Sequence, residues 1–128
     1  MGTDRSRYWM DLAEYDMETA KAMLAAGRYL YVGFLCHQTI EKMLKAAIAK
    51  TGTIPPKVHN LTRLAELGRL DAILTQEQNN FIDALLPLNI EARYPADKDK
   101  LLGVLTKDHC REIISKTEDF TLWIKSRL

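Results

Sequence analysis

Apolar residues recur every three or four positions along most of this chain, which is the spacing of an α-helix. The densest pattern runs from Tyr29 to Lys50 and consists of two adjacent apolar stripes, which leave only a narrow polar face. One stripe is Val32, Cys36, Ile40, Met43 and Ala47, and the other is Leu30, Phe34, Leu44 and Ile48. A helix that is apolar over most of its circumference packs between other elements. We therefore expect residues 29–50 to form the central helix of the fold.

Further helical patterns lie on both sides of the central segment. A first helix is expected to end near Ala26, because Gly27 follows it, and so short a link makes these two helices antiparallel neighbours. After the central helix, the Pro55–Pro56 pair predicts an extended linker. Asn60 is then expected to cap a short helix that stops at Gly68.

The second half of the chain predicts two further helices. Residues Thr75–Gln78 have the capping-box pattern, and Pro87 is expected to kink or break the helix that follows. Because Pro95 disfavours a helical conformation at the residue before it, we expect this helix to end near Arg93 and a charged loop to begin there. Thr106 is expected to cap a last helix that runs to the C-terminus.

These patterns, with no strand-like alternation, predict an all-α fold: an antiparallel up-and-down four-helix bundle with an additional short helix. A length of 128 residues suits one domain, residues 1–128, with its own core. The net charge of +1 provides no global basic field for nucleic acid. The N-terminus lacks an apolar signal segment, and no run approaches the roughly 20 residues that span a bilayer. We therefore expect a cytoplasmic protein.

Several catalytic signatures are absent from the sequence. There is no GxxxxGK[ST] or GxGxxG loop for phosphate, no HExxH or CxxC, and no GxSxG. The three histidines, His37, His59 and His109, are widely spread, so neither a metal site nor a cofactor is expected. Cys36 and Cys110 fall at apolar helix positions and are expected to be buried thiols, with a disulfide or a metal pair as the alternative.

The central helix also carries polar residues, which need partners or a ligand if they are buried. They are His37, Gln38, Glu41, Lys42 and Lys45. One interpretation is a salt-bridged edge of the helix or a dimer interface, since Glu41 precedes Lys45 by four residues. The other is a cationic cleft that binds phosphate oxygens. The residues of that cleft would be His37, Lys42, Lys45 and Arg93.

Asp16 interrupts the apolar face of the first helix. It is either an acid at the edge of that face or an inward carboxylate paired with a cation from another helix. In the second case Arg93 is the expected hub of a buried network with Asp16, His37 and Glu41, because a guanidinium has five donors. Lys42 and Lys45 would then stay solvated and free to bind phosphate. The structural polar residues are expected to be Asp16, Gln38, Glu41, His59 and Tyr94.

Four motifs occur in a fixed order along the chain. An initial helix of the form W…A…D…A…L occupies Trp9–Leu24, and Gln-x-x-Glu-Lys-x-x-Lys-Ala occupies Gln38–Ala46. His-x-Leu follows at His59–Leu61, and Arg-Tyr-Pro at Arg93–Pro95. This ordered set closely resembles the HEPN family of prokaryotic helical proteins. The resemblance implies a bundle of four to five helices that is usually dimeric and often encoded beside a minimal nucleotidyltransferase.

Many HEPN proteins look like toxins with ribonuclease activity. That activity depends on an arginine that is followed, after four to six other residues, by a histidine. In this sequence Arg93 is followed by YPADKDK, and the next histidine is His109, sixteen residues on. The subgroup with Arg-Tyr-Pro is more similar to a non-catalytic partner subunit of a nucleotidyltransferase. The resemblance therefore implies such a subunit, with a nucleotide- or substrate-binding role. The alternatives are a metal-independent endoribonuclease toxin that uses His37 or His59 with Arg93, and an interaction module with an empty cleft.

Three aromatic residues fall outside the inward stripes: Tyr29, Tyr31 and Trp123. A monomer of this size would expose them to water. We therefore expect a homodimer in solution.

Overall fold

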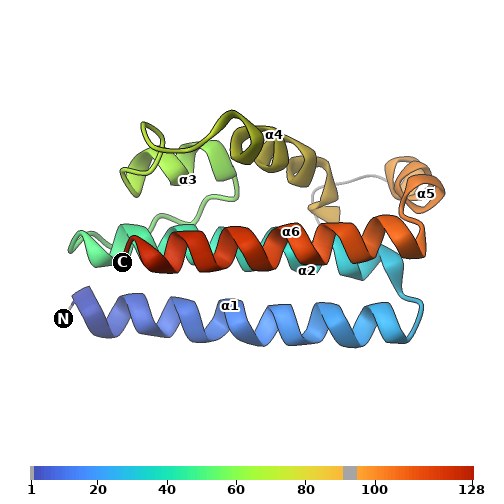
Figure 1. Cartoon of the computed structure of the whole chain (residues 1–128), viewed down its shortest axis with the longest axis horizontal. Coiled ribbons are helices and arrows are strands. Elements are labelled where there is room, and N and C mark those ends of the chain that lie inside the picture. The colour runs from blue at the N-terminus through green and yellow to red at the C-terminus, as the bar shows by residue number, and fades with distance from the viewer. Residues whose placement is uncertain (1, 91–94) are drawn as a thin grey trace.

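The structure is a computed structural model of the chain that describes residues 2–90 and 95–128, and within these residues every regular element is a helix. Figure 1 shows them in order. They are α1 (Gly2–Ala25), α2 (Tyr29–Lys50), α3 (Leu61–Leu67), α4 (Gln76–Leu85), the 3-10 helix η1 (Leu86–Leu88), α5 (Pro95–Val104) and α6 (Lys107–Ser126). The prediction of an all-α bundle is confirmed.

The four bundle helices alternate in direction in the order α1, α2, α4, α6 (Figure 1). The helices α1, α2 and α6 lie alongside one another over most of their length, and α3 and α4 cover α2 on another side. Because α2 contacts α1, α3, α4, η1, α5 and α6, it is the central helix that its two apolar stripes predicted.

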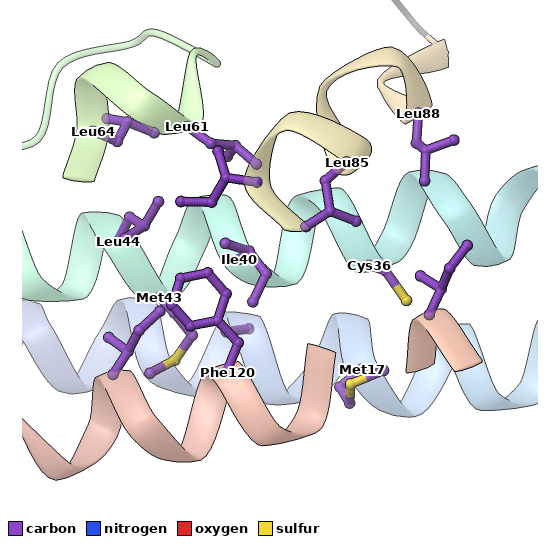
Figure 2. Close-up of a cluster of buried hydrophobic side chains, with 14 of the residues drawn as sticks. Met17, Cys36, Ile40, Met43, Leu44, Leu61, Leu64, Leu85, Leu88 and Phe120 are labelled. Carbon is purple, nitrogen blue, oxygen red and sulfur yellow. The ribbon is translucent and has the colours of Figure 1, made fainter. Parts of the chain in front are cut away.

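A single hydrophobic core forms around α2. Figure 2 shows the middle of this core, where Ile40 and Leu44 of α2 lie among side chains from α1, α3, α4, η1 and α6. These neighbours are Met17 of α1, Leu61 and Leu64 of α3, Leu85 of α4, Leu88 of η1 and Phe120 of α6. Burial of each such large apolar side chain stabilises the fold by roughly 1.5–3 kcal/mol. The core thus packs α2 against α1, α3, α4, η1 and α6.

The helix starts follow local capping rules. The Asn60 side chain accepts a hydrogen bond from the Arg63 backbone N–H at 3.1 Å at the start of α3. Thr75 and Gln78 exchange side-chain and backbone hydrogen bonds at 3.0 and 2.9 Å at the start of α4. Thr106 caps α6 in the same way as Asn60 caps α3. All three caps are confirmed, because each depends only on residues within one turn.

The charged loop expected after Arg93 is wrong, because Pro95 begins the ten-residue helix α5. Proline is tolerated at the first helical position, since its missing N–H would have no partner there and its fixed φ suits a helix. Pro87, by contrast, acts as expected: α4 ends at Leu85, and Pro87 lies within η1. The predicted helix end near Arg93 falls on residues 91–94, outside the described residues.

Cys36 and Cys110 are free thiols and fully buried, which confirms the expectation for both. Tyr29 and Trp123 are half-buried against the core, whereas Tyr31 is exposed. Among the described residues, no helix combines the length and the apolar character that crossing a membrane requires.

Candidate functional site

Four polar side chains meet beside α2, and we call them the Glu41 cluster: His37, Glu41, Lys45 and His59. The Glu41 carboxylate is at the centre. Lys45 Nζ donates to Glu41 Oε2 at 3.2 Å, and His59 Nδ1 lies 2.8 Å from Glu41 Oε1. His37 Nδ1 is 4.0 Å from the same Oε1 atom. One buried carboxylate therefore faces three basic side chains.

His59 reaches this carboxylate from the linker between α2 and α3. The linker contains the Pro55–Pro56 pair, and Asn60 caps α3 immediately after it, so His59 is held between two rigid features. Because a carboxylate only accepts hydrogen bonds, Nδ1 carries the hydrogen in this contact. The His59 side chain is 61% exposed, while that of Glu41 is 4% exposed. His59 thus links the interior of the cluster to the surface.

Lys45 is held in the interior by two contacts. Its ammonium bonds Glu41 and also lies 5.4 Å from the centre of the Trp9 ring on α1. A cation over an indole face is favourable, and more so where water is excluded. Lys45 is only 6% exposed, so the expectation that it stays solvated is wrong. The helical spacing did not reveal this, because the Trp9 ring that covers Lys45 belongs to another helix.

Lys42 forms a separate ion pair with Asp16 of α1. Asp16 is buried and Lys42 is half-buried, so the interpretation of Asp16 as an inward carboxylate paired across helices is confirmed. Its cation is Lys42, whereas the sequence suggested Arg93. The expectation that Lys42 is unpaired is therefore wrong, and its role in binding phosphate stays a prediction. Arg93 and Tyr94 lie outside the described residues.

His37 is the deepest member of the Glu41 cluster. It is fully buried, and neither ring nitrogen has a hydrogen-bond partner among the described residues; the same is true of the neighbouring Gln38 Oε1. Burial lowers the pKa of His37, and the Glu41 carboxylate opposes this shift only in part. His37 is thus a neutral imidazole, and leaving its ring nitrogens without partners would be costly in an interior.

Among the described residues, few groups at the Glu41 cluster are free for chemistry. Within residues 2–90 and 95–128, no three histidine, cysteine or acidic side chains are placed to hold a metal ion. The lysines that face the carboxylates are engaged, and His37 is out of reach of solvent. The accessible member of the cluster is His59, with the Glu41 carboxylate behind it.

The sequence model of the HEPN domain matches residues 6–127, nearly the full chain. The chain belongs to the HEPN domain family. Two solved structures share its fold. One is the crystal structure of TT1696 from Thermus thermophilus, with 20% identity and a TM-score of 0.72 over 97% of this chain and 98% of that chain. The other is the crystal structure of ST0689, an archaeal HEPN homologue, with 22% identity and a TM-score of 0.66 over 96% of this chain and 97% of that chain. No curated protein matches the sequence.

Sequence reasoning found every α2 residue of the site in this HEPN domain but missed Trp9 as part of it. The sequence analysis named Trp9 only as the first residue of the initial-helix motif. Its contact with Lys45 depends on how α1 and α2 are aligned, as does the bond from Ser6 Oγ to the Ala46 carbonyl at 2.9 Å nearby. Spacing within one helix carries no signal for such an alignment. An aromatic residue next to a buried cation is therefore visible only in the structure.

Proposed function

We propose that this HEPN protein is a non-catalytic helical subunit that dimerises, acts with a minimal nucleotidyltransferase, and binds a nucleotide or its partner's substrate at the Glu41 cluster. The observation that supports the proposal is the placement of His59. Its imidazole is exposed and hydrogen-bonded through Nδ1 to a buried carboxylate. Because Nδ1 is bonded to Glu41, Nε2 is the nitrogen that could bond a ligand.

The chemistry of His59 suits an anionic ligand. When the ring is protonated, both nitrogens donate, so Nδ1 keeps the Glu41 carboxylate while Nε2 donates to a phosphate oxygen. Hydrogen bonds between charged groups are stronger than neutral ones. Lys57 is exposed two residues earlier on the same linker and adds a cation at the surface. Together these residues offer a phosphate group one oriented donor and one exposed positive charge.

A binding role fits the Glu41 cluster better than a catalytic one. Phosphoryl chemistry requires a cation for the charge that develops in the transition state, in addition to an acid and a base. Lys42 is paired with Asp16, and Lys45 is paired with Glu41. His37 is buried and cannot exchange protons directly with a substrate in solvent.

Titration calorimetry with ATP tests the binding role. We expect binding by the parent protein and a loss of roughly tenfold or more in affinity for His59→Ala, since a hydrogen bond to a charged group contributes about 1.5–3 kcal/mol. His109→Ala is the matched control, because His109 is also exposed but lies at the start of α6. Equal affinities of the parent and His59→Ala would contradict the proposal. So would an absence of binding by the parent at millimolar ATP.

A second candidate function is that of a metal-independent endoribonuclease. One observation favours it: a histidine oriented by a carboxylate at 2.8 Å is also the arrangement of a general base. We expect no cleavage when purified protein is incubated with RNA. Cleavage that disappears in His59→Ala, with the helical content intact, would make the endoribonuclease the better assignment.

A further inference from the structure

A groove of about 610 Å³ lies between α4 and α6, away from the Glu41 cluster. Its walls are aromatic. The rings of Phe81 and Phe120 meet at 6.4 Å between centroids, and those of Phe120 and Trp123 at 6.0 Å. Phe120 is buried, whereas Phe81 and Trp123 are half-buried and line the groove. Three neighbouring rings thus form an apolar surface that water reaches.

The side chains along the groove repeat with helical spacing on both walls. Those of α4 include Glu77, Phe81 and Ala84, and those of α6 include Lys116, Phe120 and Trp123. Each stripe covers about two turns, or roughly 10 Å, of its helix. Ala84 adds little bulk on the α4 side, so another backbone can approach closely there. The shape therefore suits about two turns of a third helix.

Two carboxylates and one ammonium lie at the rim of the groove, so acidic groups are in excess there. Glu77 and Asp119 are exposed and form no salt bridge with a described residue, but Glu77 lies close enough to attract the Lys116 ammonium. Lys116, which also lines the groove, is engaged by Glu112 at 2.8 Å. The Trp123 ring already accepts the Arg127 guanidinium at 5.0 Å, so it interacts favourably with cations. The rim thus complements a positively charged occupant.

We propose that the α4–α6 groove binds a basic amphipathic helix of a partner protein. The apolar face of such a helix packs on Phe81 and Trp123, and large aromatic residues of this kind contribute much of the binding energy at interfaces. Its lysine or arginine side chains pair with Glu77 and Asp119 at the rim. The same two carboxylates repel the phosphates of a nucleotide, so this groove is distinct in its chemistry from the Glu41 cluster.

Fluorescence anisotropy with labelled synthetic peptides tests this inference. The first peptide is a helix of about 16 residues with leucines at every third or fourth position and lysines on either side of them. The second has every lysine replaced by glutamate. We expect the basic peptide to bind at least tenfold more tightly than the acidic one, with a difference that shrinks as salt is added. Equal binding of the two peptides overturns the proposal.

Variants locate the binding site. The double variant Glu77→Gln with Asp119→Asn should weaken the basic peptide by roughly fivefold or more, since two exposed ion pairs are lost. Glu14→Gln with Asp71→Asn is the matched control, because it removes the same charge from exposed sites outside the groove. Unchanged affinity in the groove variant overturns the proposal.

A steric variant separates the groove from its rim. Ala84→Arg places a long side chain in the groove and should abolish binding while circular dichroism shows parental helix content. Two further results reject the assigned occupant. Displacement of the peptide by a nucleoside monophosphate indicates a small-ligand site. Self-association that the groove variants remove indicates a second copy of this chain.

Discussion

Replacing Glu41 with glutamine removes the charge that holds Lys45 in the interior. Both side chains are nearly inaccessible to water, and removing one partner of a buried pair usually costs about 3–5 kcal/mol. Two features of the site reduce this cost. The Trp9 ring still lies 5.4 Å from the ammonium, which stabilises it by about 1 kcal/mol, and the glutamine oxygen still accepts one hydrogen bond. We therefore expect Glu41→Gln to lose about 2–3 kcal/mol of stability.

Thermal unfolding followed by circular dichroism measures this loss. For a domain of this size, 1 kcal/mol shifts Tm by about 3–4 °C, so we expect Tm to fall by roughly 6–12 °C. Glu112→Gln is the matched control, because it breaks the exposed pair with Lys116 on α6 and should change Tm little. The double variant Glu41→Gln with Lys45→Met should recover much of the loss, since no unpaired charge stays buried. The reasoning is refuted if Glu41→Gln melts like the parent, or if the double variant is no more stable than the single one.

Three further predictions concern other parts of the molecule. Burial holds the pKa of His37 below its ordinary value of 6.5, so the unfolded chain binds this proton more readily and stability falls as pH drops below about 6.5. Between about pH 8 and pH 5, the Tm of His37→Leu should therefore fall less than the Tm of the parent protein. An equal fall in both proteins would contradict this. Burial raises the pKa of the Cys36 thiol to about 12, so a thiol reagent followed by mass spectrometry should not modify Cys36 at neutral pH until the protein unfolds. Light scattering should give about twice the 14.6 kDa monomer mass, because Tyr15 and Tyr31 are exposed; a mass near 14.6 kDa at micromolar concentration would exclude the dimer.

The sequence alone was sufficient for α1, α2, α3, α4 and α6 and for the identity of the central helix, but not for α5. Helix starts depend on residues within one turn, so Asn60, Thr75 and Thr106 were recognisable as caps without any tertiary information. The apolar stripes of α2 depend only on spacing along one helix, so they also predicted its burial without tertiary information. Pro95 was misjudged because the local rule has two outcomes: proline disfavours helix before it and favours helix after it.

Only the tertiary structure decided which polar groups meet. The pair of Asp16 with Lys42, the contact of His59 with Glu41 and the Trp9 ring beside Lys45 all join different segments. Each depends on the rotation and alignment of one segment against another, which the packing of the whole core sets. The α4–α6 groove likewise depends on how these two helices are placed against each other. The sequence therefore determined which residues lie on the polar edge of α2, and the packing of the bundle decided which of them are engaged and which face solvent.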